Sequence, residues 1–240
     1  MDILARISNR LAGAAAHRQG AGRPFITLTY AQSLDGSIAA RPGRPLLLSG
    51  PESQTLTHAL RAAHDAILVG IGTVLADDPR LTVRLAPGAN PQPVVVDSRL
   101  RFPLYANLLR QNGVPPWIAT SDKADPERQA SLERAGARVF RLPTGPQGLL
   151  DLGALLAQLG DWEINRVMVE GGAQIIASLL AERLVDQVVI TIAPVLVGGL
   201  RVLDHFQPPL PAHSLPLRQI FYQQVGEDLV LRGDPDWTAK

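Results

Sequence analysis

Two glycine turns are the stretches of this sequence whose residue types best suit ligand chemistry. The first, Gly70-Ile71-Gly72-Thr73, follows the apolar run Ala66–Val69. The second, Glu170-Gly171-Gly172, follows the run Arg166–Val169 and leads directly into a helical pattern. Glycine has no Cβ and lets a ligand come close to the backbone, and free N–H groups at a helix start attract phosphate. Each turn alone is also common as a plain strand-to-helix connection. The two together favour a site for a nucleotide.

Charged side chains stand beside both turns. Arg61 and Arg84 lie on either side of the first turn, and their fork-shaped guanidinium groups suit phosphate or carboxylate. Glu170 stands at the carboxyl end of its predicted strand, where open α/β sheets place ligand-binding groups. We therefore expect Glu170 to bind a substrate by hydrogen bonds or to assist proton delivery. The alternative for these residues is an ordinary solvated surface.

Apolar runs that alternate with helical patterns must position these residues, which favours an α/β fold with a largely parallel sheet. A helix is predicted to begin at the N-cap Ser49, with Pro51 in its first turn, and to end near Leu60. The last two runs, joined by Gly226-Glu227-Asp228, predict a C-terminal β-hairpin, so the sheet should be mixed. The predicted strands are Phe25–Tyr30, Ala66–Val69, Val94–Val96, Trp117–Ser121, Arg138–Leu142, Arg166–Val169, Val188–Ile192, Ile220–Val225 and Leu229–Arg232.

Composition limits the possible function classes. The chain has 240 residues, a net charge of +1 and no cysteine. We expect an N-terminal helical extension over residues 1–23 and a single domain over 24–234. The balanced charge argues against a nucleic-acid surface, and no apolar run approaches the roughly 20 residues of a membrane span. The lack of cysteine and of histidine motifs predicts no metal site, and it suits a cytoplasmic protein. For His58 and His64 we expect core or surface roles.

Several ordered motifs give the chain a family resemblance. It resembles the riboflavin-biosynthesis reductase, 5-amino-6-(5-phosphoribosylamino)uracil reductase, which is the C-terminal domain of a bifunctional deaminase/reductase. This resemblance implies a dihydrofolate-reductase-like fold, with a mixed, mainly parallel central sheet flanked by helices. The motifs that carry it are Ser33–Gly36, Leu60–Ala62, Asp65–Gly70, Gly72–Val74, Asp77–Arg84, Val169–Gly172, Ala193-Pro194 and Gly198-Gly199.

The resemblance also implies an activity and its residues. The enzyme would use NADPH to reduce the ribosylamino side chain of a phosphorylated pyrimidine to ribitylamino, and it would form a homodimer, for which the apolar run Val188–Val197 is a candidate interface. The substrate would contact Arg61, Leu81, Arg84 and Glu170. The cofactor would contact Ala31, Thr73, Asp77, Ser98, Gly171, Gly172, Ala173, Gln174, Ile175, Ile176, Ala177 and Ser178.

One departure from the family pattern leaves alternatives open. Pro45 and Leu47 stand where the family usually has serine and tryptophan. Proline offers no N–H, and leucine cannot stack as an indole does. The chain is therefore also compatible with an NADPH-dependent reductase of a pterin or another heterocycle, or with a non-enzymatic nucleotide-binding paralogue.

A second group of polar residues bears on the choice of cofactor. Thr120 and Ser121, with Arg99 or Lys123 nearby, are candidates for holding the 2′-phosphate that distinguishes NADPH from NADH. An ordinary polar loop after a strand is an equally good interpretation of these residues.

Overall fold

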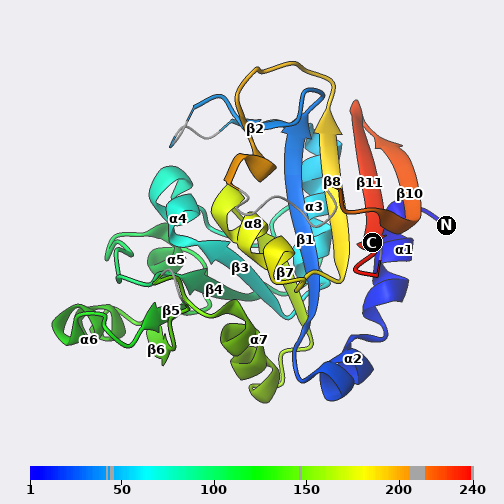
Figure 1. The fold of residues 1–240 in the computed structure, drawn as a ribbon. Coiled ribbons are helices and arrows are strands. Elements are labelled where there is room, and N and C mark those ends of the chain that lie inside the picture. Colours follow the sequence, from blue (N-terminus) through cyan, green and yellow to red (C-terminus); the bar gives the residue numbers. More distant parts are fainter. Residues whose placement is uncertain (42, 44–45, 146–147, 206–213, 239–240) are drawn as a thin grey trace.

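The computed structural model describes the chain except for residues 42, 44–45, 146–147, 206–213 and 239–240. Within the described residues, nine strands form one sheet in the order β10-β11-β8-β1-β7-β3-β4-β5-β6 (Figure 1). Their bounds are β1 Phe25–Ser33, β3 Ala66–Gly70, β4 Gln92–Val96, β5 Trp117–Ser121, β6 Arg138–Leu142, β7 Arg166–Glu170, β8 Gln187–Ala193, β10 Leu217–Val225 and β11 Asp228–Pro235.

The sheet is mixed and mainly parallel, as the sequence predicts. Strand β1 lies near its middle and pairs in parallel with β7 and β8, for example Thr29 with Glu170 and Tyr30 with Ile190. Among the described strands of this sheet, only the β8–β11 and β10–β11 pairs are antiparallel, and the second pair is the predicted C-terminal hairpin. The central strands are almost continuously apolar because helices cover both of their faces.

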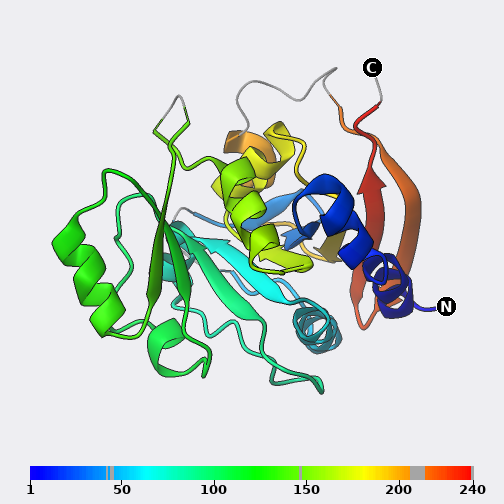
Figure 2. The same cartoon turned by 90° about the horizontal axis from the view of Figure 1, so that it is seen from below.

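Helices form a layer on each side of the sheet (Figure 2). Helices α7 and α8 pack on one face around Leu156 and Ile176. On the other face, α5 and α6 cover β4 and β5, while α1 and α3 cover β1 and β8. The helix bounds are α1 Ile3–Leu11, α2 Ala14–Ala21, α3 Pro51–Ala62, α4 Ile71–Asp77, α5 Asn107–Arg110, α6 Pro126–Arg134, α7 Leu152–Asp161 and α8 Ala173–Ala181, with a 3₁₀ turn η1 at Val202–His205.

The N-terminal residues, for which the sequence predicts a helical extension, form the two helices α1 and α2. Helix α1 begins at Asp2, whose carboxylate accepts the N–H of Ala5, and α2 ends at Gly22 in the left-handed conformation. The buried face of α1 includes Ile7, which packs in one cluster with Leu60 of α3 and Val189 of β8. The N-terminal helix therefore supports two elements that also line the cavity described below.

The predicted helix cap at Ser49 is wrong by one residue. Gly50 is the N-cap of α3, and no side chain caps the helix from that position. The N–H of Gly50 instead donates to the carboxylate of Asp228, at 2.8 Å, from the turn of the C-terminal hairpin. Pro51 does occupy the first turn. A carboxylate distant in the sequence thus fixes the residue at which the helix begins, while no side chain at the N-cap accepts the free N–H groups of the first turn.

Asp35 joins the loops that follow β1 and β8. Its carboxylate accepts the hydroxyls of Ser33 (2.5 Å) and Ser37 (2.8 Å) and the backbone N–H groups of Val197 (3.0 Å) and Gly198 (2.8 Å). These four hydrogen bonds hold the pKa of Asp35 well below its usual range. The bond from the Ser33 hydroxyl has the largest effect. Asp35 therefore connects the two loops.

A two-stranded sheet extends from this junction over the end of the main sheet. Strands β2 (Ser37–Ala39) and β9 (Leu200–Arg201) pair in antiparallel fashion. Gly199 precedes β9, and a Cβ there would lie 2.1 Å from the carbonyl oxygen of Ala39. Only glycine permits this close approach.

Candidate active site

A cavity of about 870 Å³ opens at the carboxyl ends of the parallel strands. Its wall comes from the ends of β1, β3, β4 and β7, from α3 on one side, and from Ile38, Ala39 and Leu200 of the small sheet. The size is typical of a site for a small molecule with its cofactor. The end of an open α/β sheet is also where such sites are usually found.

The two glycine turns meet in this cavity. Strands β3 and β7 are neighbours, so their carboxyl ends lie together. The N–H of Gly172 donates to the hydroxyl of Thr73 at 3.1 Å, and a Cβ on Gly70 would lie 2.9 Å from a side-chain carbon of Ile175. Gly172 is the N-cap of α8 and offers no side chain to its free N–H groups. The helix therefore presents an uncapped, partly positive end to the cavity.

Glu170 and Arg61 form a bidentate ion pair in the cavity wall. The guanidinium donates to the two carboxylate oxygens at 2.7 and 2.6 Å. A third hydrogen bond runs from Arg61 to the carbonyl oxygen of Thr82 at 3.0 Å. Burial opposes the charge on Arg61, but the Glu170 carboxylate outweighs this and raises the pKa of Arg61. The guanidinium of Arg61 is therefore already bound to Glu170, and it orients the carboxylate.

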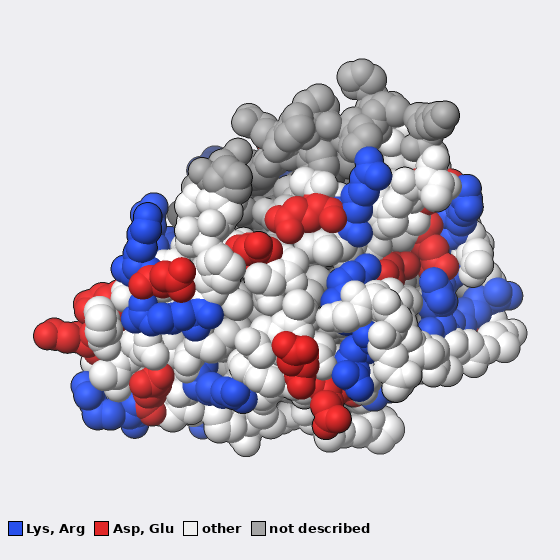
Figure 3. All heavy atoms as spheres, turned by 60° about the horizontal axis from the view of Figure 1, so that its bottom comes forward, with Lys and Arg blue, Asp and Glu red and all other residues white. Residues whose placement is uncertain are grey.

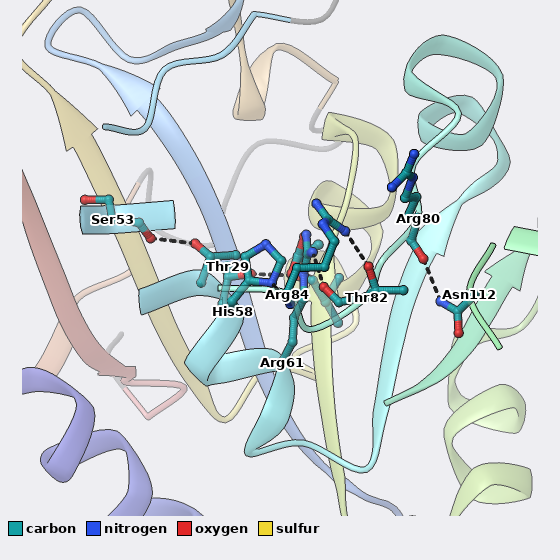
Figure 4. Close-up of polar contacts among 11 residues, drawn as sticks. Thr29, Ser53, His58, Arg61, Arg80, Thr82, Arg84 and Asn112 are labelled. Atoms are coloured by element: carbon teal, nitrogen blue, oxygen red, sulfur yellow. Dashed lines mark hydrogen bonds and ion pairs between the residues drawn. The ribbon is translucent and has the colours of Figure 1, made fainter. Parts of the chain in front are cut away.

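An irregular segment over residues 79–84 lies beside this pair, and side chains from other elements bind its backbone (Figure 4). The amide of Asn112 donates to the carbonyl oxygen of Arg80 at 2.6 Å. The N–H of Arg84 donates to Nδ1 of His58 at 2.8 Å. The guanidinium of Arg84 donates to the hydroxyl of Thr82. The segment thus carries Arg80 and Arg84 on a backbone that side chains of other elements hold by hydrogen bonds.

Electrostatics make this rim of the site positive. Desolvation and the charges of Arg61 and Arg80 lower the pKa of Arg84. Glu170 is bound to Arg61, and neither Arg80 nor Arg84 has an ion-pair partner among the described residues. An anionic group brought to this rim would find unneutralised positive charge.

Two further titratable groups in the cavity wall have displaced pKa values. Burial raises the pKa of Tyr30 to about 12, so its hydroxyl stays protonated. Desolvation also raises the pKa of Asp77. The sequence analysis did not predict Tyr30 as a cavity residue. Its place near the end of β1, the strand next to that of Glu170, could have indicated it.

Most of the predicted contact residues line the cavity, and three do not. Arg84 is exposed beside it, as just described. Ile176 and Ala177 are buried on the side of α8 that faces the core. The predicted residues that do line it are Ala31, Arg61, Thr73, Asp77, Leu81, Ser98, Glu170, Gly171, Gly172, Ala173, Gln174, Ile175 and Ser178.

The departures from the family pattern fall at the cavity mouth. Leu47 lines the cavity with 78% of its surface exposed. Pro45 lies outside the described residues. Leu47 therefore offers an apolar surface at the entrance.

A smaller hollow of about 320 Å³ adjoins the cavity through Ser98, Arg99 and Gly148. Ser121 and Lys123 also line it. The prediction that Thr120 belongs with them is wrong, because Thr120 is completely buried and lines neither space. Alternate residues of a strand point to opposite faces, so Ser121 and Thr120 cannot both face the hollow.

The histidines near Arg61 both lie in the interior. His64 is buried between α3 and β1, where Nδ1 donates to the carbonyl oxygen of Leu60 at 2.7 Å and Nε2 accepts the hydroxyl of Thr27 at 2.9 Å. Desolvation lowers its pKa to about 4. Within the described residues, no three histidine, aspartate or glutamate side chains gather as a metal site would require, and no helix is long and apolar enough to span a membrane.

Comparison with known proteins settles the family. The family model described as the RibD C-terminal domain matches residues 24–231. The chain belongs to this family. Because the relatives in this family are reductases, the protein is an oxidoreductase.

Relatives and structures agree with the assignment. The chain is 44% identical to the 2,5-diamino-6-ribosylamino-4(3H)-pyrimidinone 5′-phosphate reductase of Methanothermobacter thermautotrophicus, over 91% of this chain and 99% of that protein. The structure of RibD from Acinetobacter baumannii is 26% identical with a TM-score of 0.77, covering 92% of this chain and 60% of that one. A dihydrofolate reductase from Enterococcus faecalis, 13% identical over 88% of this chain and 96% of its own, shares the fold with a TM-score of 0.51. The expected dihydrofolate-reductase-like fold is confirmed.

The charged surface shows no dominant sign on the face in Figure 3, where basic and acidic side chains intermingle. This agrees with the net charge of +1.

Proposed function

We propose that this protein reduces the ribosylamino side chain of a phosphorylated aminopyrimidine to ribitylamino, with NADPH as the reductant, in riboflavin biosynthesis. The observation that carries the proposal is the meeting of both glycine turns with the Arg61–Glu170 pair in one cavity. The name of the Methanothermobacter relative, which the chain matches over almost its full length, supports the same reaction.

The substrate is proposed to be the 2,5-diamino-6-ribosylamino-4(3H)-pyrimidinone 5′-phosphate named for that relative. The uracil compound expected from the sequence motifs is the second candidate, favoured by the similarity to RibD. The two bases differ at C2, which carries an amino group in the first and an oxygen in the second. Leu47, in place of the usual tryptophan, changes the cavity mouth and supports a substrate that differs from that of the bifunctional enzymes.

The cavity residues suit a nicotinamide dinucleotide. The uncapped start of α8 and the Gly171-Gly172 backbone would hold the pyrophosphate. Arg99 and Lys123, with Ser121, would bind the 2′-phosphate from the adjoining hollow and so favour NADPH over NADH. Bound NADPH supplies the hydride. If Arg99→Ala leaves the ratio of Kd values for NADPH and NADH unchanged, this assignment is incorrect.

The side chains of the cavity would orient the substrate and stabilise its charge. Reduction of the ring-opened imine adds a hydride to C1′ and a proton to the nitrogen. Glu170, held in place by the two hydrogen bonds from Arg61, would accept hydrogen bonds from the substrate close to that centre. Arg84 and Arg80 at the positive rim would bind the 5′-phosphate. Orientation and electrostatics are the contributions that a protein makes in hydride transfer from a cofactor.

The test is NADPH oxidation measured with each pyrimidine, with dihydrofolate as the control for a pterin reductase. We expect oxidation with the diaminopyrimidinone and a product heavier by two hydrogens. Glu170→Gln should lower kcat about 100-fold, in the range of a lost charged contact to the reacting group, while the Kd for NADPH stays within twofold. Turnover of dihydrofolate alone would favour the pterin alternative. NADPH binding without turnover of any of the three would contradict the proposed reaction.

We also propose that the protein is a cytoplasmic homodimer. The loop after β8 exposes Val195 and Leu196, the latter by 78%, and Leu34 lies next to Val195 through a backbone hydrogen bond of 2.9 Å. An exposed apolar group of this kind favours burial against a second copy. Sedimentation over a hundredfold range of concentration should give a dimer, and Leu196→Glu should give a monomer.

A further inference from the structure

We propose that His58 is a positioning residue for phosphate recognition: its neutral imidazole fixes the backbone at Arg84 and thereby places the guanidinium that receives the substrate's 5′-phosphate. This inference rests on the proposed function and assigns a role within the same site. His58 does not line the cavity and touches neither proposed ligand. Its effect would pass entirely through Arg84.

The first step of the argument is that Arg84 is available for an anion where Arg61 is not. All three hydrogen bonds recorded for Arg61 go to Glu170 and to the carbonyl oxygen of Thr82. Among the described residues, the guanidinium of Arg84 donates only to the uncharged hydroxyl of Thr82, and its neighbours Arg61 and Arg80 are both cationic. A phosphate would relieve this repulsion and satisfy the remaining donors.

The second step is that His58 fixes Arg84. Residues 79–84 belong to no helix or strand, so a repeating hydrogen-bond pattern does not hold their backbone. The N–H of Arg84 instead donates to Nδ1 of His58, at 2.8 Å, and His58 is only 5% exposed on helix α3. Figure 4 shows His58 and Arg84 side by side. An imidazole nitrogen can accept this bond only when it carries no proton, so the proton of the neutral ring is on Nε2.

The third step is that protonation would reverse this contact. A proton on Nδ1 would place two N–H groups against each other. The charged groups that face the ring are Arg61 on its own helix, Arg84 on the neighbouring segment and Glu170 at the end of β7. Burial, followed by the two arginines, lowers the pKa of His58 against the opposing effect of Glu170. The neutral, accepting form is thus the form present near neutral pH.

Two substitutions separate the acceptor from the rest of the side chain. In His58→Asn, Oδ1 takes the place of Nδ1 and keeps an acceptor that does not titrate. In His58→Leu, the volume remains and the acceptor is lost. We measure KM and kcat with the phosphorylated substrate, the inhibition constant of the dephosphorylated substrate as a competitor, and the Kd for NADPH. An inhibition constant can be measured for the dephosphorylated compound even if the enzyme does not reduce it.

We expect His58→Leu to raise KM for the phosphorylated substrate about tenfold, since a buried N–H loses its acceptor. The inhibition constant of the dephosphorylated compound, the Kd for NADPH and kcat should stay within about twofold. His58→Asn should keep the wild-type KM at pH 7.5. As the pH is lowered from 7.5, KM should rise more steeply in the wild type than in His58→Asn, because the phosphate titrates in both and His58 in only one.

Three results would overturn the inference. They are an unchanged KM in His58→Leu, an equal weakening of the phosphorylated and dephosphorylated compounds, and identical pH profiles for the wild type and His58→Asn. The last comparison remains decisive if His58→Leu does not fold. A wild-type protein that turns over neither pyrimidine would instead contradict the proposed function, so the two failures are distinguishable.

Discussion

Acid should destabilise this protein through His64, and the structure allows the size of the effect to be worked out. The ring is 4% exposed, and both nitrogens are hydrogen-bonded in the neutral form, to Leu60 and Thr27. Its pKa falls from 6.5 to about 4 on folding, chiefly because burial penalises the charged ring. The unfolded chain therefore binds a proton at a pH where the folded protein does not. The stabilising contribution is complete above pH 6.5 and is lost as the pH falls towards 4.

The displacement corresponds to about 3 kcal/mol over the whole interval, of which ~2 kcal/mol is lost between pH 7 and pH 5. We would measure the free energy of unfolding by urea titration at both pH values, for the wild type and for His64→Gln. The wild type should lose about 2 kcal/mol more than the variant over this interval. Other groups that titrate, including His58, are present in both proteins and cancel in the comparison.

Equal losses in the two proteins would refute the reasoning. They would mean that His64 titrates at a similar pH in the folded and unfolded states, and hence that water or an anion reaches the ring in the folded protein. A larger loss in the variant than in the wild type would refute it as well.

Three other predictions concern packing and the loops at the site. Ile7→Ala should lower the free energy of unfolding by about 3 kcal/mol, measured by urea titration, since Ile7 is fully buried; a change below 1 kcal/mol would mean that α1 is not firmly packed. Asp35→Asn should lower Tm and speed proteolytic cleavage between residues 194 and 199, because one of its two acceptor oxygens becomes a donor; cleavage at the wild-type rate would contradict this role. Gly199→Ala should abolish turnover while far-UV circular dichroism is preserved, since its Cβ would clash with the carbonyl oxygen of Ala39 and displace the small sheet; wild-type turnover would show that this sheet is not needed.

The order and type of most elements could be predicted from the sequence because the signals are local. Buried parallel strands such as Val94–Val96 are short apolar runs, and the turn at Gly226 joins two such runs into a hairpin. The glycine turns could be recognised because each follows a strand and precedes a helix. Strand adjacency then brings them together, as β3 and β7 show.

The parts that sequence reasoning missed depend on contacts between distant residues. Nothing near Arg61 in the sequence indicates that Glu170, 109 positions away, occupies its guanidinium. The hydrogen bond from the N-cap residue Gly50 to Asp228 spans 178 positions. Thr120 failed as a ligand candidate because the face to which a strand residue points depends on register as well as on sequence. His58 resembled a core residue, and its role appears only once Arg84 is seen against it.

The position of β1 in the sheet determines when the protein can fold during its synthesis. Strands β3 to β6 are consecutive in the chain and pair with one another in order, so this half can assemble as it leaves the ribosome. Strand β1 is made earlier than any of them, yet its two partners, β7 and β8, begin only at Arg166 and Gln187. A nascent or truncated chain that ends before residue 166 therefore leaves the backbone N–H and C=O groups of β1 unpaired on both edges, which makes this apolar strand a target for chaperones and proteases. The active site, which needs β1, β3 and β7 together, is one of the last parts of the molecule to form.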